Sequence, residues 1–592
     1  MHAFAAASAT SWLLWSTVHA AVPYTRSLIR TDSNCRVLPG DSNWPTKEVW
    51  NRLNQTVGGR LIATVPLGAV CHPGGYADIE PDGAKCTELA QKWDLPQTFI
   101  NQSGDIMNPW YQNNSCSPFH HLDRPCELGN YVNYAIAASG ADEFINAIKF
   151  TQTYNVRLVI KNTGHDFLGK STGKGGLSLW THGLKSMEIT KYASSAYNGP
   201  AIKVGAGITG GEVLDHANKA GYRVVTGDCP TVGTAGGYSA GGGHGLLINT
   251  YGLGADNVLE WEVITADGQH LTASPTNNTD LYWALTGGGA GTYAAVLGVT
   301  IKLHAEGSVG AATLSFNATA SRDNDSYVAA LNEWWKFIPD LVDAGASPSF
   351  NFFRDGFRIH NTTAPNKTMD EMADIFRPYL TKLDDLGVPY TFVTYNAPSY
   401  LSHYNATNGP LPYGPYQASQ LFNSRLIPRT ISLNPAPLTT AILTMTDHDI
   451  AADWQLGCSG FNVNSSRIAH PDNAVVSYWR DAVAVCLEFS IYNWTVPEAT
   501  MLARRQDLAN IIHPMIEVAT PGSGAYLNEA DPQVYPHGNN VKWQDAFYGL
   551  NYEQLREVKD RWDPKAVFYA YTAVGSEDWE EDADGRLCRV EA

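Results

Sequence analysis

The sequence predicts an α+β fold built from a glycine-rich region, a distinct central region and a chain end that returns to the first. Residues 201–303 alternate short β-type runs with glycine clusters, and these clusters thin out after about residue 309, where aromatic residues rise. A dense motif then appears between residues 520 and 592. This order favours one α+β region over 127–308, an antiparallel sheet with helices over 309–515, and a last segment, 516–592, that packs on the glycine-rich region.

The segment 21–126 is rich in Pro, Gly, Asn and Cys and holds few periodic stretches. We expect a disulfide-braced extension that covers part of the main region, because cysteines of an oxidising compartment mostly pair. Nine cysteines are present, so at least one is left unpaired. Cys229 is the expected free thiol because it alone lies among glycine turns, whereas Cys588 is expected to return to the early cysteines. The full set is Cys35, Cys71, Cys86, Cys116, Cys126, Cys229, Cys458, Cys486 and Cys588.

Regular elements alternate through the glycine-rich region. Residues 141–154 place apolar side chains at helical spacing, and the β-type run 156–160 leads directly into a glycine turn. The Asp267-Gly268 turn predicts a hairpin between 258–266 and 271–273. The other expected elements are strands at 201–204, 222–225 and 296–303 and helices at 212–220 and 281–285.

Composition limits the class of protein and its partners. The chain has 592 residues, 44% hydrophobic and 17% charged, which is typical of a folded protein with two or more domains. A net charge of −18 disfavours nucleic acid and anionic membranes as partners. No later run is long and apolar enough to span a bilayer.

The first twenty residues resemble a secretory signal peptide, with an apolar run at 12–15 and small residues at 18–20. The alternative is an ordinary apolar N-terminus. Eleven Asn-x-Ser/Thr sequons support secretion and N-glycans. We therefore expect a secreted, extracellular glycoprotein and a monomer. The sequons are Asn54, Asn101, Asn113, Asn277, Asn317, Asn324, Asn361, Asn366, Asn405, Asn464 and Asn493.

Two glycine-rich turns carry one histidine and one cysteine, His165 and Cys229, which lie 64 residues apart. Glycine lets backbone N–H groups approach a phosphate or a flat ring closely. Two nucleophilic side chains in such turns suggest a cofactor that is both cradled by the protein and bonded to it. The alternatives are a satisfied loop histidine at 165 and a half-cystine or buried thiol at 229.

Three blocks of residues occur in a fixed order along the chain, at 160–171, at 227–245 with 251–258 and 280–291, and at 526–531 with 547–552 and 562–568. Together they resemble the FAD-linked oxidases of the vanillyl-alcohol-oxidase superfamily, in the berberine-bridge-enzyme-like branch. The nearest likeness is to secreted fungal flavoproteins described as isoamyl-alcohol-oxidase-like. The resemblance covers about 130–305 and 520–575.

This resemblance implies a PCMH-type FAD-binding domain in two parts, 127–308 and 516–592, around a substrate domain at 309–515. His165 would bond the 8α-methyl of the flavin and Cys229 its C6, giving a bicovalent FAD with a raised redox potential and an open substrate cleft. The other residues that would hold the cofactor are Asn162, Thr163, Gly164, Asp166, Gly169, Ser171, Thr231, Val232, Gly233, Gly236, Gly237, Tyr238, Gly243, His244, Gly252 and Asn551.

Two positions depart from the family pattern. The family's second tyrosine near the C-terminus is the catalytic base, and here Glu529 takes its place; Tyr526 and Asp531 are the neighbouring catalytic candidates. Glu529 could accept a hydroxyl proton if partial burial makes it basic enough. Otherwise it caps a turn, or the base lies elsewhere in the central domain. Tyr238 stands where many relatives have histidine, and for His244 a supporting role near the glycine loop is favoured over catalysis.

The function that the resemblance implies is oxidation of an alcohol carbon, with hydride transfer to the covalent flavin and reduction of O₂ to hydrogen peroxide. Valine at position 232, which gates oxygen access in the family, favours O₂ as the acceptor. The substrate would be a small alcohol, a carbohydrate or a secondary metabolite. The alternatives are a flavin dehydrogenase, an oxidative cyclase of secondary metabolism, and a secreted flavoprotein of low turnover.

Two further patterns have simpler explanations. Cys116, His120, His121, Asp123 and Cys126 fit no familiar zinc spacing, so a disulfide loop is expected and no metal site is assigned. The aromatic residues of 334–353 favour core packing over a sugar-binding cleft.

Overall fold

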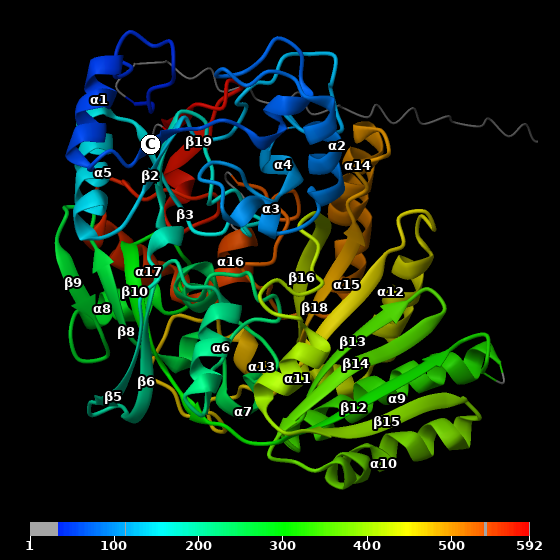
Figure 1. Ribbon diagram of the computed structural model, residues 1–592. Coiled ribbons are helices and arrows are strands. Elements are labelled where there is room, and N and C mark those ends of the chain that lie inside the picture. The colour runs from blue at the N-terminus through cyan, green and yellow to red at the C-terminus, as the bar shows by residue number, and fades with distance from the viewer. Residues whose placement is uncertain (1–33, 113, 322, 538–541, 591–592) are drawn as a thin grey trace, which may run out of the picture.

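The computed structural model describes residues 34–590 except 113, 322 and 538–541. Three sheets organise this part of the chain (Figure 1). The predicted signal peptide at 1–20 lies outside the described residues. Among the helices that are described, none has the length and apolar character needed to cross a membrane.

The first sheet is four-stranded, with the order β1-β2-β4-β3. Strands β2, β4 and β3 are parallel, and β1 joins the edge antiparallel to β2. Helix α5 (Ala141–Tyr154) connects β2 to β3 and buries Phe144, Ala147 and Ile148. The strands are β1 (Leu61–Ala63), β2 (Tyr134–Ala137), β3 (Arg157–Lys161) and β4 (Gly176–Trp180).

The second sheet has five antiparallel strands in the order β5-β6-β10-β8-β9. Helix α6 (Gly210–Lys219) begins earlier than predicted because Thr209 and Glu212 form a capping box. Helix α8 (Thr279–Leu285) precedes the last strand. The strands are β5 (Met187–Ala193), β6 (Asn198–Gly205), β8 (Val258–Ile264), β9 (His270–Ala273) and β10 (Ala295–Lys302).

The third sheet is seven-stranded and wholly antiparallel, in the order β15-β12-β14-β13-β17-β18-β16, as predicted for the central region. Helices α9 (Asn324–Asp343), α10 (Met369–Leu386) and α12 (Ala436–Asp447) pack on it. The strands are β12 (Val309–Asn317), β13 (Ser347–Phe353), β14 (Gly356–Pro365), β15 (Tyr390–Ala397), β16 (Gln420–Pro428), β17 (Gln455–Gly460) and β18 (Ala482–Ile491).

Strand alternation gives the two faces of this sheet different roles. Phe350 and Phe352 point to the helices, where Trp334 and Trp335 are fully buried, so the aromatic cluster is core as predicted. Asn351, Gly457 and Leu487 are in register across β13, β17 and β18 and line a cavity on the opposite face. One face of the sheet is therefore core and the other is a binding surface.

The N-terminal extension contains α1 (Lys47–Thr56), α2 (Gly83–Lys92), α3 (Gln97–Ile100) and α4 (Pro109–Gln112). Helix α1 lies beside α5 at the first sheet, whereas α2 lies near α14 (Glu498–Asp507) (Figure 1). Disulfides Cys71–Cys86 and Cys116–Cys126 brace the extension, which confirms the disulfide loop expected at 116–126. Cys35 pairs with Cys588, so the two ends of the described chain meet. The fourth disulfide, Cys458–Cys486, joins β17 to β18 and leaves Cys229 as the free cysteine.

The C-terminal segment returns to the glycine-rich half, through α16 (Lys542–Tyr548), α17 (Tyr552–Trp562) and the hairpin β19 (Trp579–Glu581) and β20 (Leu587–Arg589). Phe568 forms a parallel bridge with Leu158 of β3. Helix α17 packs on α8. Lys559 of α17 donates to the Thr292 carbonyl at 2.8 Å.

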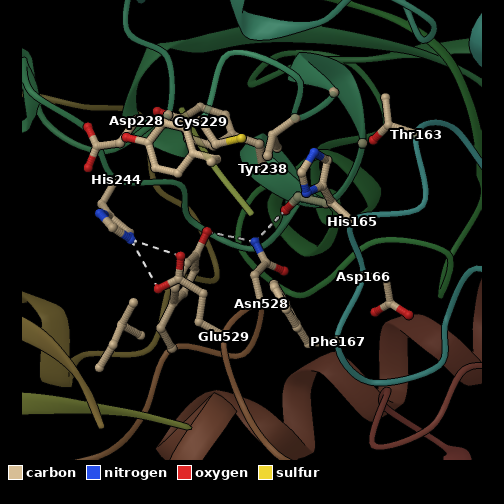
Figure 2. A pocket seen from close by; sticks show the side chains of 18 of the residues that line it. Thr163, His165, Asp166, Phe167, Asp228, Cys229, Tyr238, His244, Asn528 and Glu529 are labelled. Atoms are coloured by element: carbon tan, nitrogen blue, oxygen red, sulfur yellow. Dashed lines mark hydrogen bonds and ion pairs between the residues drawn. The ribbon is translucent and has the colours of Figure 1, made fainter. Parts of the chain in front are cut away.

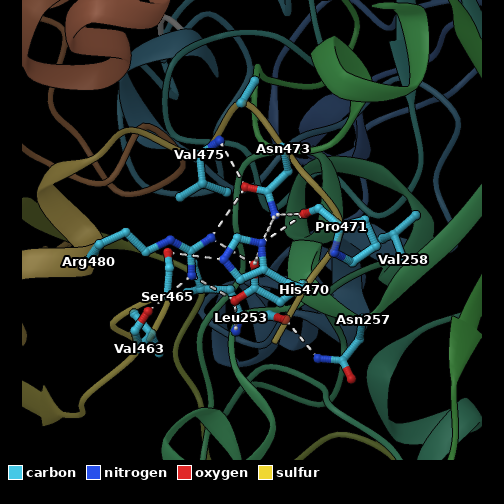
Figure 3. Close-up of polar contacts among 12 residues, drawn as sticks. Leu253, Asn257, Val258, Val463, Ser465, His470, Pro471, Asn473, Val475 and Arg480 are labelled. Atoms are coloured by element: carbon cyan, nitrogen blue, oxygen red, sulfur yellow. Dashed lines mark hydrogen bonds and ion pairs between the residues drawn. The ribbon is translucent and has the colours of Figure 1, made fainter. Parts of the chain in front are cut away.

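A buried ion pair joins the glycine-rich half to the central domain (Figure 3). The Asp256 carboxylate, whose side chain is 0% exposed, accepts two hydrogen bonds of 2.8 Å from Arg480. Asn473 donates to it at 2.9 Å, and His470 Nδ1 lies 3.7 Å away. Burial alone would raise the pKa of Asp256, but Arg480, together with His470 and Asn473, outweighs burial and lowers it.

The observed elements differ from the predicted ones mainly at their ends. The strand expected at 222–225 is only β7 (Tyr222–Arg223), paired with β11 (His304–Ala305), because Val224 and Val225 turn into the core. One predicted glycan site does not fit the fold: Asn361 is 3% exposed, and its amide donates to the Thr363 hydroxyl.

Candidate active site

A cavity of about 780 Å³ lies between the glycine turns and the open face of the seven-stranded sheet. The turns after β3 and β7 form one wall of the cavity. The C-terminal loop 526–529 closes the side between this wall and the sheet (Figure 2). Apolar side chains from the sheet, Phe422, Val485, Leu487 and Phe489, form the opposite wall. The cavity is thus made from all three blocks singled out in the sequence together with the central domain.

His165 and Cys229 meet at one hydroxyl group. His165 Nε2 lies 2.7 Å from Thr231 Oγ1, and Cys229 Sγ lies 3.3 Å from the same oxygen. Both nucleophiles line the cavity although 64 residues separate them. A ligand in the cavity can therefore contact the imidazole and the thiol together.

The environment of His165 keeps its imidazole neutral. Burial, helped by the nearby charge of Lys161, lowers the pKa of His165 to about 4. The neutral ring retains a lone pair and remains nucleophilic at all pH values well above 4. Burial also raises the pKa of the Cys229 thiol, so this sulfur is protonated at neutral pH before any ligand is bound.

Polar side chains fix the shape of the His165 turn. Gly164 adopts φ +88°, which glycine allows readily. The Asp166 carboxylate accepts backbone N–H groups of Leu168, Lys170 and Ser171. The Asn162 amide donates to the Ala206 carbonyl at 2.8 Å and so ties this turn to the second sheet. These residues hold the wall of the cavity in place.

The walls fit a flat, phosphorylated cofactor. A Cβ added at Gly236 or Gly291 would meet nothing within 4 Å, so backbone faces open cavity there. The Tyr238 ring packs against Gly243 and Gly254, where a Cβ would approach it to less than 3 Å. Its buried hydroxyl has no partner among the described residues, which leaves it available to a ligand.

Glu529 and His244 form an ion pair across the cavity from the His165 turn (Figure 2). His244 Nε2 lies 3.1 and 3.2 Å from the two carboxylate oxygens. Burial alone would lower the pKa of His244, but Glu529, together with Asp228, raises it. His244 lines the cavity and supports Glu529 from beside the glycine loop.

Tyr526 is the second polar group of the C-terminal loop in the cavity. Its hydroxyl accepts the Gly243 N–H at 3.2 Å and the Asn528 amide at 2.7 Å. Both contacts are donations to the phenol oxygen, so the O–H remains free to donate to a ligand. Asn528 also donates to the Gly237 carbonyl at 2.6 Å, which anchors the loop to the glycine turn.

Several predicted residues lie outside the cavity wall. Asp531, predicted as catalytic, is buried in an ion pair with Arg505 at 2.9 Å and supports the loop from behind. Asn551 donates to the carbonyls of Ala474 and Val475 instead of reaching the cavity. Gly169, Gly243 and Gly252 shape turns behind the wall.

The wall also contains residues that were not predicted, among them two with ionisable side chains in the region between the turns and the central domain. The Asp228 carboxyl lies next to Cys229, and Tyr416 enters from the central domain. Asp228 could have been noticed because it lies inside the 227–233 motif. Tyr416 carries no local signal, because it belongs to a Pro- and Gly-rich segment that reaches the cavity only through the tertiary fold.

Two segments of the chain that contribute to this cavity match known protein families. Residues 132–274 match the family described as FAD binding domain. Residues 525–575 match the family described as berberine and berberine like. The first range contains His165 and Cys229, and the second contains Tyr526 and Glu529.

Whole-length relatives and a solved structure agree with these matches. FAD-linked oxidoreductase orf1 of Neocamarosporium betae is 62% identical over 98% of this chain and 99% of its own. Bifunctional decalin synthase calF of Penicillium decumbens is 44% identical over 95% and 96%. The crystal structure of the VAO-type flavoprotein MtVAO615 from Myceliophthora thermophila C1 superposes with a TM-score of 0.89 at 43% identity, over 94% of this chain and 100% of that one.

Proposed function

The chain belongs to the VAO-type, berberine-bridge-like FAD-linked oxidoreductases, and from this premise we propose that it oxidises an alcohol carbon with an FAD bonded to His165 and Cys229 and with O₂ as the acceptor. The observation that carries the proposal is that these two nucleophiles both line the cavity and both contact the Thr231 hydroxyl. When bound, the flavin supplies the two-electron redox chemistry.

The chain's own residues bind, orient and exchange a proton. Backbone at Gly236 and Gly237 would hold the cofactor, and the neutral His165 ring and the Cys229 thiol would provide its two attachment points. The Tyr526 hydroxyl donates to the substrate oxygen, while the Glu529 carboxylate accepts the proton of the substrate hydroxyl. His244 holds Glu529 in place through its Nε2. Val232 lies in the wall beside Cys229, which supports oxygen access near the cofactor.

The proposal is tested by anaerobic mixing of the purified flavoprotein with benzyl alcohol, 3-methylbutan-1-ol, decan-1-ol and cellobiose, followed by admission of air. We expect one of these alcohols to bleach the flavin absorbance, and air to restore it with one peroxide per carbonyl product. Bleaching without rapid recovery in air would assign a dehydrogenase. Absence of bleaching by the whole panel would contradict alcohol oxidation.

Glu529→Gln should slow flavin reduction by about 10²–10⁴-fold, because glutamine cannot accept the hydroxyl proton. The measurement is stopped-flow flavin reduction at saturating alcohol. Glu262→Gln, which changes a surface carboxylate of β8, is the matched control and should keep the wild-type rate. A loss below about tenfold, roughly 1.4 kcal/mol, would place the base elsewhere.

Cys229→Ala should leave a flavin attached through His165 alone, with a shifted absorption spectrum and a lower redox potential. The expected rate of flavin reduction falls, because a lower potential weakens the driving force. Spectra of acid-denatured protein and a potentiometric titration measure both effects. An unchanged spectrum would contradict the thioether bond and leave Cys229 a free thiol.

An oxidative cyclisation is the second candidate function. It is supported by the apolar wall of Phe422, Leu487 and Phe489, which suits a folded hydrocarbon chain better than a sugar, and by the likeness to a protein named a bifunctional decalin synthase. Product analysis by mass spectrometry and NMR separates the two functions. A simple carbonyl product has lost two hydrogens at the alcohol carbon, whereas a cyclised product shows new ring bonds in its NMR spectrum.

We also propose that the protein acts outside the cell as a glycosylated monomer. Four disulfides support an oxidising compartment. Seven described sequons are exposed and open to glycans: Asn101, Asn277, Asn317, Asn324, Asn366, Asn405 and Asn493.

A further inference from the structure

The cavity contains a second carboxyl group that the proposed mechanism does not use. Asp228 lines the wall, and it lies on the other side of His244 from Glu529 (Figure 2). No lysine or arginine of the described residues forms an ion pair with it. Among the residues that the structure describes, its carboxyl receives the neutral donors Asn408, whose amide lies at 3.5 Å, and the Leu246 N–H.

His244 uses only one of its two ring nitrogens to contact Glu529. Nε2 is engaged by Glu529, whereas Nδ1 is buried without a partner within the described parts of the chain. A buried nitrogen of an imidazolium carries a proton that it can give away. Asp228 is close enough to act on His244 electrostatically, since it contributes to raising the pKa of this histidine.

We propose that Asp228 stores the proton that Glu529 removes from the substrate hydroxyl, with His244 passing the proton between the two carboxylates. This inference rests on the proposed function and extends it. Asp228 acts through His244 and Glu529 and does not itself touch the substrate.

The transfer balances in protons and charge. Glu529 takes the hydroxyl proton, and His244 gives its Nδ1 proton toward Asp228 while it keeps the proton on Nε2. The imidazole ring must then turn so that its unprotonated Nδ1 takes the proton from Glu529. The alcohol's carbon–hydrogen bond supplies the two electrons to the flavin, and a carbonyl is formed. His244 and Glu529 end as they began, and Asp228 has gained one proton. No direct hydrogen bond joins His244 to Asp228, so the transfer to Asp228 needs rotation of the Asp228 side chain or one bridging water.

The surroundings of Asp228 suit a group that releases its proton afterwards. Burial, with some help from Glu529, raises the pKa of Asp228 to about 6, against the opposing effect of His244. A group with this pKa takes a proton during the reaction and loses it again at neutral pH. The other titratable side chains that face it from the central domain and the neighbouring turn are Tyr400, Tyr404, Tyr416 and Cys229.

The test compares wild type with Asp228→Asn in anaerobic reduction of the holoprotein by the panel alcohol that bleaches wild type fastest, between pH 5 and 9. Because a proton store must be ionised beforehand, the wild-type rate should fall as the pH drops through about 6. Asp228→Asn should be at least about tenfold slower at pH 8 and lose this dependence near pH 6. Asp228→Glu should restore it.

A second readout does not depend on activity. A carboxyl whose pKa is raised on folding destabilises the folded state as the pH rises from about 4 to 6. The melting temperature of Asp228→Asn should therefore exceed that of wild type by more at pH 7.5 than at pH 4. Asp94→Asn is the matched control: burial also raises the pKa of Asp94 to about 6, but Asp94 does not line the cavity. It should share the thermal signature and keep the wild-type rate.

The outcomes separate the two claims. A wild-type rate and pH profile in Asp228→Asn would overturn the inference and leave the proposed function standing. A melting difference that does not change with pH would overturn the assigned ionisation of Asp228. If no panel alcohol reduces the wild-type flavin, the proposed function fails and the inference falls with it.

Discussion

Replacement of His165 by alanine should abolish most of the covalent flavin. Nε2 of the imidazole lies 2.7 Å from Thr231 Oγ1, which also contacts the Cys229 thiol. The low pKa of His165 keeps the ring neutral and therefore nucleophilic. Without this ring the cofactor loses the attachment nearest the turn that follows β3. The pellet of acid-precipitated protein should then hold less flavin than that of wild type, and any flavin that stays should be attached through Cys229 alone.

The matched control is His304→Ala. Burial lowers the pKa of His304 as it does that of His165, but His304 stacks on Tyr251 away from the cavity. This variant should keep its covalent flavin. Acid-stable flavin in His165→Ala equal to that of wild type would contradict the role assigned to His165.

Replacement of Arg480 by methionine should cost about 3–5 kcal/mol of folding free energy, because it leaves the Asp256 carboxylate buried without its cation. The pair joins the glycine-rich half to the central domain, so the loss should also loosen the cavity between them. The melting temperature at pH 7, followed by tryptophan fluorescence, measures the effect. A change of less than about 1 kcal/mol would mean that the buried ion pair contributes no more to the free energy of unfolding than an exposed ion pair does.

The pH dependence of this deficit has a defined sign. Arg480 lowers the folded-state pKa of Asp256, so the stabilisation is complete above the unfolded value of about 3.8 and is lost as the pH falls through the lower folded value. In Arg480→Met the unpaired carboxyl takes up a proton as the pH falls, and the deficit should shrink toward pH 4. Lys92→Met, which removes an exposed partner of Glu88, is the control and should change stability by no more than about 0.5 kcal/mol.

Local patterns predicted much of the fold. Helix α5 has the bounds expected from its apolar spacing, and β8 and β9 pair through the predicted Asp267-Gly268 turn. Errors lie where tertiary contacts decide the end of an element, as at Val224 and Val225. The number and order of strands in the central sheet were not predictable, since its pairs join residues that lie far apart in the sequence, such as β12 with β15.

The candidate site was predicted unevenly for a physical reason. The glycine turns are formed by residues that are neighbours in the sequence, so the turns around His165 and Cys229 could be predicted from the sequence alone. Their shared contact with Thr231 and the pairing of His244 with Glu529, 285 residues apart, exist only in the folded chain. Asp531 was a catalytic candidate next to Glu529 in the sequence, but its carboxylate pairs with Arg505 and does not line the cavity.

The measurement that tests the central claim most directly is a map of the flavin-bearing peptides from wild-type protein denatured with acid. Digestion and mass analysis should find one flavin linking the peptide that contains His165 to the peptide that contains Cys229. Flavin on the His165 peptide alone would contradict the second bond. A colourless pellet with free flavin in the supernatant would contradict the covalent cofactor altogether.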